Sequence, residues 1–180
     1  FQNWVLIHDD IEDDSDERRG QPALHKQVGM PVALNVGDAL HVYMWQVLNQ
    51  DMISKEMRQE FLEMIHRTAE GQHLDLSRIA QNRFDVSEEE YLDMVTRKSA
   101  YYTVVSPLRL GAMCANIKPD ARLSEAGKDL VIAFQIRDDV LNLSESEGYG
   151  KEFAGDLYEA KRTLILVHLF AHANVSEKAE

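Results

Sequence analysis

The sequence predicts an all-α protein that forms one domain over residues 1–180. Only four prolines and nine glycines interrupt the chain. Apolar residues recur at helical spacing, and no strand-like alternation persists. The composition, 44% hydrophobic and 28% charged, is ordinary for a folded domain of this length.

The first predicted helix begins before Phe1 and ends near Asp14, where the chain becomes strongly acidic. Seven of the nine positions from 9 to 17 are carboxylates, and two arginines follow directly. On a helix, Asp9 and Asp13 share a face and lie about 6 Å apart. Like charges that close raise each other's pKa unless a cation lies between them. Mg²⁺ suits this position because it binds one or two carboxylates and takes further ligands from phosphate oxygens.

Acidic runs also occur on solvated helix faces and in calcium-binding loops. A solvated face is the most common setting for a generic acidic run. A calcium-binding loop is excluded, because Ser15 stands where that loop requires glycine and Gln21 where it requires glutamate. The arginine pair at positions 18 and 19 favours a phosphate ligand, since guanidinium binds phosphate with two parallel hydrogen bonds.

The middle of the chain contains two further predicted helices. A loop extends through residues 20–22, and Pro31 can occupy the first turn of a helix over residues 32–49. Ser54 is the expected N-cap of a long helix that runs toward Asp75. Gly71 lies within this helix, where glycine costs about 1 kcal/mol relative to alanine, so we expect another group to approach closely there.

The second half contains three more predicted helices. Residues 87–90 form a capping box that opens a helix running past Lys98, and Pro107 should kink or break it. Ser124 is the expected cap of a helix over residues 123–143. After a polar loop at residues 144–150, a last helix is expected over residues 156–172. Cys114, the single cysteine, is expected to be a packed core thiol.

A second acidic pair lies in the predicted helix over residues 123–143. The sequence FQIRDDVLNL at residues 134–143 places Gln135, Asp138, Asp139 and Asn142 on one face. Because the flanking residues are apolar, two carboxylates there would be costly without a partner. Basic residues follow this pair as they follow the first. The two clusters together favour a metal-bridged diphosphate site over two unrelated surface patches.

The chain resembles the E-type (trans) polyprenyl diphosphate synthases, the family of farnesyl and geranylgeranyl diphosphate synthases. Six motifs in the family's order carry the resemblance. They are DDxxD at residues 9–13, the arginine pair at 18–19, GQxxDL at 71–76, a KSAYY element at 98–102, FQxxDDxLD at 134–142, and the closing element with Gly150, Lys151, Asp156, Leu157 and Lys161. The sequence departs from the family at Asn142, where aspartate is usual, and at Ala160, where glycine is usual.

The resemblance implies an isoprenoid synthase-type helical bundle around a central cavity, with both ends missing. It also implies roles for individual residues. The implied metal-site residues are Asp9, Asp10, Asp13, Asp138, Asp139 and Asn142, with Asp10 and Asp139 in supporting positions. The implied substrate-binding residues are Arg18, Arg19, Gln72, Asp75, Lys98, Ser99, Gln135, Lys151, Asp156 and Lys161. The catalytic set comprises Lys98, Tyr102, Gln135 and Lys161, and Trp4 and Val5 would limit chain length.

The implied reaction joins an allylic diphosphate to isopentenyl diphosphate with about three Mg²⁺ ions per active site. Trp4 lies five positions before Asp9, so we expect a short product, geranylgeranyl rather than farnesyl diphosphate. The alternatives are a longer-chain synthase for quinone side chains, a non-catalytic regulatory subunit of a heteromeric synthase, and a class I terpene cyclase. The arginine pair favours a synthase over a cyclase.

Net charge and hydropathy limit the classes of partner that this chain is expected to bind. A net charge of -12 argues against nucleic acid or an anionic membrane as the main partner. No apolar run approaches membrane-spanning length. By analogy with the family we expect a homodimer, and a reducing, cytoplasmic compartment suits a chain that cannot form an internal disulfide. The chain begins at Phe1 within a helical pattern, so we interpret it as an excerpt whose targeting signal is unreadable.

Overall fold

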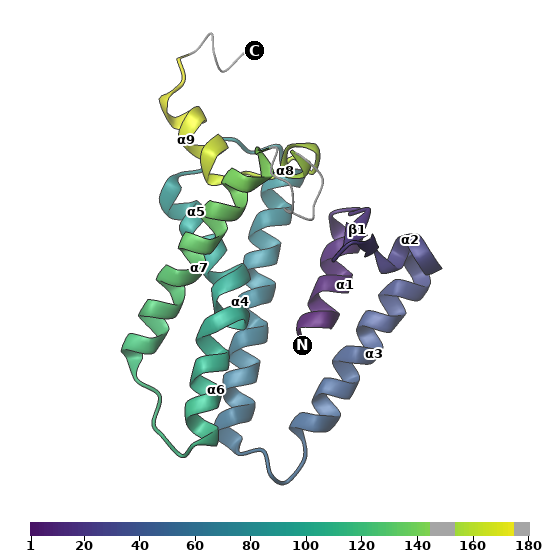
Figure 1. The fold of residues 1–180 in the computed structure, drawn as a ribbon, viewed down its shortest axis with the longest axis vertical. Helices are drawn as coiled ribbons and strands as arrows, with labels where there is room; N and C mark the ends of the chain where they lie inside the picture. Colours follow the sequence, from purple (N-terminus) through teal and green to yellow (C-terminus); the bar gives the residue numbers. More distant parts are fainter. Residues whose placement is uncertain (145–153, 175–180) are drawn as a thin grey trace.

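The fold is helical, as predicted. A computed structural model describes residues 1–144 and 154–174 of the chain. Within these residues, the only strands are β1 (Glu17–Arg18) and β2 (Gln21–Pro22), which pair in a small antiparallel hairpin. Figure 1 shows the long helices side by side, with this hairpin near one end of them. The hairpin lies in the stretch that the sequence predicts to be a loop.

The first two long helices pack against each other through a small residue. Helix α1 (Gln2–Glu12) leads through the hairpin and the short α2 (Leu24–Val28) to α3 (Met30–Leu48), and α1 and α3 are in contact. A Cβ atom added to Gly37 of α3 would lie 2.2 Å from Nε2 of His8. Pro31 occupies the first turn of α3, which confirms the predicted start of this helix.

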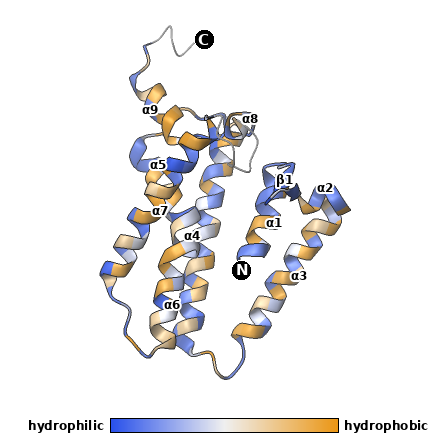
Figure 2. Ribbon diagram, in the orientation of Figure 1, coloured by the Kyte–Doolittle hydropathy of each residue, from blue (hydrophilic) through white to orange (hydrophobic). Residues whose placement is uncertain are grey.

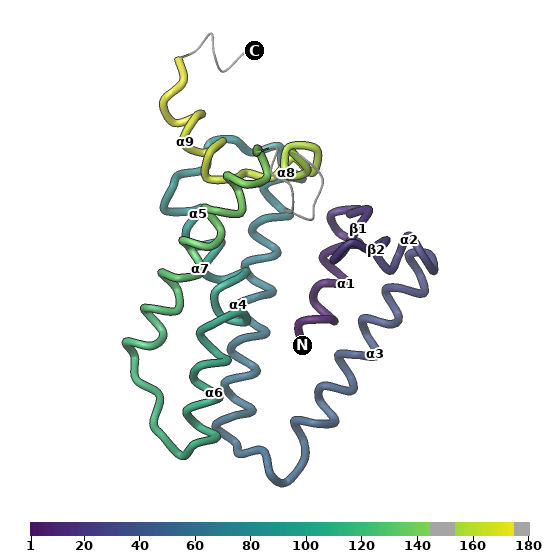
Figure 3. The backbone as a smooth tube through the Cα atoms, viewed as in Figure 1, coloured from purple at the N-terminus to yellow at the C-terminus, as the bar shows by residue number. Residues whose placement is uncertain are grey.

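Helix α4 (Lys55–Ala80) is the longest helix and begins where the sequence predicts. The Ser54 hydroxyl accepts a hydrogen bond from the Met57 amide at 3.2 Å. Figure 3 shows α4 alongside α6, with the two helices running in opposite directions. The chain then enters α5 (Glu88–Val95), and the predicted capping box is present, with Ser87 and Glu90 exchanging both hydrogen bonds.

The helix that begins as α5 changes type twice before it ends. Residues Thr96–Val105 form a π-helix, η1, and α6 (Ser106–Cys114) continues from it. Pro107, which has no N–H to donate to the preceding turn, lies in the first turn of α6, directly after η1 ends. The predicted break at Pro107 is therefore a change from π to α geometry. Cys114 at the end of α6 is exposed, so the expectation of a core thiol is wrong.

At Gly71, the backbone of α4 lies very close to the backbone of η1. A Cβ atom at this position would lie 2.1 Å from the backbone nitrogen of Lys98 and 2.5 Å from its Cα. These are backbone atoms, so they cannot move aside as a flexible side chain could. The close approach predicted at Gly71 is therefore made by the backbone of η1, which carries Lys98.

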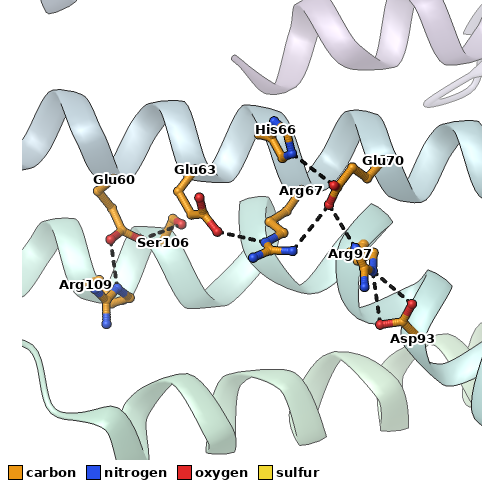
Figure 4. Close-up of polar contacts among 9 residues, drawn as sticks. All are labelled: Glu60, Glu63, His66, Arg67, Glu70, Asp93, Arg97, Ser106 and Arg109. Atoms are coloured by element: carbon orange, nitrogen blue, oxygen red, sulfur yellow. Dashed lines mark hydrogen bonds and ion pairs between the residues drawn. The ribbon is translucent and has the colours of Figure 1, made fainter.

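A row of polar contacts fixes α4 against η1 and α6 along their length (Figure 4). At one end, the buried Glu60 carboxylate accepts hydrogen bonds from the Ser106 hydroxyl and from Nε of Arg109, both at 2.8 Å. Further along, Arg97 of η1 donates to Glu70 of α4 at 2.9 Å. Glu63, Arg67 and Asp93 extend the row. These contacts set how η1 lies along α4.

Helix α7 (Ala121–Asn142) carries the second acidic pair and packs on η1. Its cap is Asp120, whose carboxylate accepts from the Arg122 amide at 2.9 Å. The predicted cap, Ser124, is wrong because it lies inside the helix. The core of this contact consists of Val131 of α7 with Ala100 and Val105 of η1, all fully buried.

The last predicted helix is wrong in one respect, because it is two helices rather than one. Helix α8 (Gly155–Tyr158) and helix α9 (Leu164–His172) are separated by a turn in which Ala160 has a φ of +54°. A left-handed residue cannot continue an α-helix. Thr163 caps α9, its hydroxyl accepting from the Leu166 amide. The predicted polar loop at residues 144–150 lies outside the described residues beyond position 144.

Apolar side chains remain exposed on several helices. Figure 2 shows hydrophobic residues along α3, α7 and α9. On α3, Val32, Tyr43 and Val47 are more than half exposed and share one face, about a quarter turn around the helix from the buried Ala33 and Gly37. Across the described ranges, no helix combines the length and apolarity needed to cross a membrane.

We predict that Gly71→Ala destabilises the full-length protein by about 3 kcal/mol, because the new methyl group overlaps backbone atoms of Lys98. Urea unfolding measures the change. Gly111→Ala is the matched control, since nothing lies within 4 Å of a Cβ at this helical position. The control should be neutral or stabilising by up to about 1 kcal/mol. Equal losses in the two variants would contradict the close approach.

Candidate active site

The first acidic cluster lies at the C-terminal end of α1, and the hairpin folds Arg18 back over it. Asp10 is only 3% exposed, and its Oδ1 accepts hydrogen bonds from Nε and Nη2 of Arg18. Arg18 also donates to Asp9 at 3.2 Å. The tight return is possible because Arg19 and Gly20 both adopt positive φ angles. Asp10 therefore faces Arg18, and its carboxylate charge is balanced without a metal ion.

Asp9 faces α4 and η1. Its Oδ1 accepts a hydrogen bond from the Gln72 amide at 3.2 Å and lies 3.8 Å from Nζ of Lys98. Burial alone would raise the pKa of Asp9, but Lys98, Lys161 and Arg18 outweigh burial and hold that pKa below its usual value. Lys98 is fixed in turn by the buried Asp75 of α4, at 2.6 Å. Asp75 thus supports Lys98.

Asp13 pairs with a lysine from the far end of the chain. Nζ of Lys161 lies 2.8 Å from Oδ2 of Asp13 and 2.5 Å from Glu159. Burial would lower the pKa of Lys161, but these two carboxylates reverse the effect and raise it. Burial raises the pKa of Asp13, whereas the pKa of Asp9 is lowered. Such a split is expected when two like charges share one site.

The second acidic cluster divides its two aspartates between different environments. Asp139 is 3% exposed and accepts three hydrogen bonds, from the Tyr91 hydroxyl at 2.7 Å, the Gln135 amide at 3.0 Å and the Leu164 backbone amide at 3.1 Å. Both of its oxygens are thereby occupied. Asp138, one position earlier, is partly exposed. Of this pair, Asp138 is the residue that is more accessible to solvent.

Asn142, expected at the edge of the metal site, is buried in a structural position. Its side-chain oxygen accepts from the Asp156 amide at 3.3 Å, and its backbone oxygen accepts from the Ala154 amide at 2.8 Å. An amide and a carboxylate can both accept these bonds, so the departure from the family motif at this position preserves the contact. The structure places Asn142 as a support for the chain before α8.

The remaining predicted residues differ in how closely they approach this cluster. Tyr102 of η1 contacts the ring of Phe1, with centroids 5.8 Å apart. Ser99 is partly buried on η1, and Arg19 is exposed in the hairpin turn. Lys151 lies outside the described residues. The structure therefore gathers α1, α4, η1 and the turn before α9 around one set of carboxylates and ammonium groups.

A cavity of about 290 Å³ lies between α1 and α4. Trp4 and Val5 of α1 line it opposite Ile65 and Thr68 of α4, and Gln72 borders it. Because Gln72 also binds Asp9, the cavity adjoins the acidic cluster. The indole of Trp4 stacks on the His41 ring with centroids 4.0 Å apart and an interplanar angle of 7°. The two residues predicted to limit chain length therefore lie at this cavity.

Four residues at or beside the site have no counterpart among the residues singled out from sequence. Tyr91 binds Asp139, and Glu12 accepts from Gln72 at 2.6 Å. His41 supports Trp4, and Thr68 lines the cavity with its hydroxyl buried and without a hydrogen-bond partner among residues 1–144 and 154–174. Glu12 lies within the acidic run and could have been found there. The other three have no local signal, because their partners are distant in sequence.

Known proteins resemble this chain over almost its whole length. The family model described as Polyprenyl synthetase matches residues 1–180. A geranylgeranyl diphosphate synthase of Sulfolobus acidocaldarius is 36% identical over 187 residues, covering 99% of this chain and 56% of that protein. A short chain isoprenyl diphosphate synthase of Methanothermobacter thermautotrophicus is 34% identical with similar coverage. This chain thus spans about half the length of the curated relatives it matches.

Solved structures give the same result for the fold. Farnesyl diphosphate synthase of T. brucei, in complex with a bisphosphonate, superposes with a TM-score of 0.85 at 26% identity, over 99% of this chain and 68% of that one. A polyprenyl synthase from Caulobacter crescentus, complexed with calcium and isoprenyl diphosphate, has a TM-score of 0.85 at 30% identity, over 99% of this chain and 54% of that one. The predicted helical fold is therefore confirmed.

We predict that Tyr91→Phe lowers the stability of the full-length protein by about 2 kcal/mol, since it removes a buried hydrogen bond to a carboxylate. Urea unfolding at neutral pH measures the loss. Tyr158→Phe removes a hydroxyl from an exposed side chain and should change stability by less than about 0.5 kcal/mol. Equal effects would contradict the role of Tyr91 in holding Asp139.

The difference in stability between the parent and Tyr91→Phe should depend on pH. Burial, followed by the charge of Asp139, raises the pKa of Tyr91, so its hydroxyl keeps its proton when the unfolded chain loses one near pH ~10. The stability contributed by Tyr91 is thus complete below pH ~10 and is lost as the pH rises further. The difference between parent and Tyr91→Phe should therefore shrink above pH ~10.

Proposed function

Because the chain belongs to the polyprenyl synthetase family, we propose that the protein containing it is a trans-prenyltransferase. It condenses an allylic diphosphate with isopentenyl diphosphate in a Mg²⁺-dependent reaction. The observation that carries this proposal is the convergence of Lys98 and Lys161 on Asp9 and Asp13. The four residues come from α1, η1 and the turn before α9, and they bring equal numbers of positive and negative charges to one place.

This arrangement suits a ligand that carries both signs of charge. A diphosphate with bound cations can replace each ammonium–carboxylate pair by two new contacts, lysine to phosphate oxygen and carboxylate to metal. The lysines would otherwise compete with metal ions for the aspartates. The site therefore favours binding of metal and diphosphate together over binding of either alone.

The residues fit Mg²⁺. Oxygen donors of Asp9, Asp13 and Asp138 would hold it, while Asp10 and Asp139 keep their present partners and support these ligands. Within residues 1–144 and 154–174, no three His, Cys, Asp or Glu side chains form a group that could hold a metal ion by themselves. Phosphate oxygens of the substrate would thus complete the coordination of about three ions. When bound, Mg²⁺ neutralises charge on the departing diphosphate.

Other residues of the chain bind the two substrates and orient the groups that contact them. Lys98, Lys161 and Arg18 bind oxygens of the allylic diphosphate and balance the negative charge that grows on it as the allylic carbon–oxygen bond breaks. Asp75 orients Lys98, and Gln72 orients Asp9. The exposed Arg19 lies in the hairpin turn and suits isopentenyl diphosphate. Tyr102 and Gln135 border the reacting carbons, where the tyrosine ring stabilises a carbocation.

Three further residues complete the proposed diphosphate site. Ser99 follows Lys98 on η1 and can donate its hydroxyl to a phosphate oxygen. Lys151 and Asp156 flank the segment that precedes Lys161. The backbone amide of Asp156 is already bound to Asn142, which fixes the position of that residue beside the site.

The cavity between α1 and α4 suits the growing prenyl chain. It adjoins Asp9 through Gln72, and Trp4 and Val5 line it. Trp4 is held by its stack on His41, so the indole forms a rigid barrier. We therefore propose a short product, with geranylgeranyl favoured over farnesyl diphosphate.

The exposed apolar face of α3 supports the proposal of a homodimer. Val32, Tyr43 and Val47 are exposed on one face of this helix, beside the face on which Gly37 meets α1. A contiguous apolar helix face is typical of a protein interface. A second copy would bury this face through a symmetric contact.

The deciding experiment is a condensation assay of the full-length protein with Mg²⁺, isopentenyl diphosphate and an allylic primer. We expect chain elongation that stops on addition of a chelator, with geranylgeranyl diphosphate as the main product by chromatography. The mass of the active species, measured by light scattering in the same preparation, tests the homodimer. No condensation by the isolated protein would contradict the proposal and favour a regulatory subunit. Longer products would favour a quinone side-chain synthase.

Replacement of Trp4 tests the chain-length proposal. Trp4→Ala opens the cavity floor, so we expect the main product to lengthen by at least one isoprene unit. Trp4→Phe keeps an aromatic ring at the same position and should preserve the parent distribution. An unchanged product distribution in Trp4→Ala would remove Trp4 as the floor.

A further inference from the structure

The turn between α8 and α9 carries two adjacent basic residues whose side chains contact different parts of the molecule. Lys161 reaches α1 and pairs with Asp13 at 2.8 Å. Arg162 reaches the loop that follows α4 and is only 4% exposed. The position of the Lys161 ammonium group therefore depends on what holds the backbone of this turn. The proposed reaction gives Arg162 no direct part.

Arg162 is bound on several sides. Its Nε donates to the backbone oxygen of Arg83 at 2.9 Å, and its Nη2 donates to the side-chain oxygen of Asn82 at 3.1 Å. Its Nη1 donates to the backbone oxygen of Ala160 within the turn itself. The guanidinium also lies over the Phe84 ring, 4.0 Å from the centroid. A planar group with several donors can make these contacts at once, whereas a lysine cannot.

The loop that receives Arg162 is itself fixed. Arg83 forms ion pairs with Asp85 and Glu90 at 3.0 Å each. Phe84 packs against Phe170 of α9, with ring centroids 4.7 Å apart. Arg162 therefore ties the turn to a structured part of the molecule that includes the capped start of α5. On its other side, the turn is held by the hydrogen bond from the Leu164 amide to Asp139.

The turn needs such contacts because its backbone is unfavourable by itself. Ala160, directly before Lys161, adopts a φ of +54°. This conformation costs a residue with a side chain about 1–2 kcal/mol, so Ala160 keeps it only where surrounding contacts enforce it. The hydrogen bond from Arg162 to the Ala160 oxygen acts on this same peptide unit. Arg162 therefore binds the same residue whose backbone conformation is strained.

We propose that Arg162 is a positioning residue for diphosphate binding, because it holds the turn from which Lys161 reaches the acidic cluster. The inference rests on the proposed function, in which Lys161 binds the allylic diphosphate. Arg162 acts through Lys161 and does not touch the substrate, because its guanidinium is buried against the loop at residues 82–84. Loss of Arg162 therefore weakens diphosphate binding only while Lys161 is present.

A double-mutant cycle tests this dependence in the full-length enzyme. Calorimetry measures binding of inorganic pyrophosphate in the presence of Mg²⁺ to the parent, Arg162→Gln, Lys161→Gln and the double variant. We expect Arg162→Gln to weaken binding about 10-fold in the parent and less than about 2-fold in the Lys161→Gln background. Arg162→Lys should behave as Arg162→Gln does. Arg122→Gln, which changes an exposed arginine at the start of α7, is the matched control and should bind as the parent does.

A second variant keeps the test valid if Arg162→Gln does not fold, which thermal unfolding will show. Asn82→Gly removes one acceptor of Arg162 and tolerates the positive φ of 49° at this position. It should weaken pyrophosphate binding about 3-fold, again only with Lys161 present.

Two results would overturn the inference alone: an equal loss of affinity in both backgrounds, which marks a general structural role, or no loss in the parent background. A parent enzyme that neither binds pyrophosphate nor forms product would overturn the proposed function as well.

Discussion

Charge neutralisation among buried carboxylates and basic side chains is the constraint on which the rest of this structure depends. Asp9, Asp10 and Asp13 lie within one helical turn at the end of α1, and each has a basic partner. Charges with this little solvent around them must be paired or they destabilise the fold by several kcal/mol. The partners come from the hairpin, from η1 and from the turn before α9. The carboxylates thus draw distant parts of the chain to one place.

The packing of the helices holds these carboxylates and their basic partners in fixed positions. Gly71 lets the backbone of α4 touch that of η1, and the row of ion pairs along α4 fixes the two helices lengthwise. Asp75 and Lys98 therefore face each other at a set distance. A diphosphate entering the site would meet ammonium groups that are already in position, so little conformational entropy is lost on binding.

Sequence reasoning succeeded where the signal was local. The capping box at Ser87 and the cap at Ser54 each depend on neighbours within a few positions. The acidic faces were found by helical spacing. The break before Lys161 was missed, because an alanine gives no sign that it will adopt a left-handed conformation.

Three residues of the predicted metal site have hydrogen-bond partners that helical spacing does not reveal. Asp10, Asp139 and Asn142 share a helix face or a motif with neighbours nearer the proposed ligand, but each turns to a partner that is distant in sequence or contributed by the backbone. Spacing predicts which side of a helix a residue occupies. It does not predict which oxygen atoms are already taken by Tyr91, Arg18 or a backbone amide.

The π-helix η1 has a consequence for how this region can change in evolution. Lys98 near its start reaches Asp75, while Ala100 and Val105 further along are buried against α7. Each added or removed residue rotates the rest of a helix about its axis, so a single insertion or deletion between these positions would turn one set of contacts away from its target. Substitutions can accumulate along η1, but its length is fixed. Among homologues, we therefore expect alignment gaps to avoid residues 96–105.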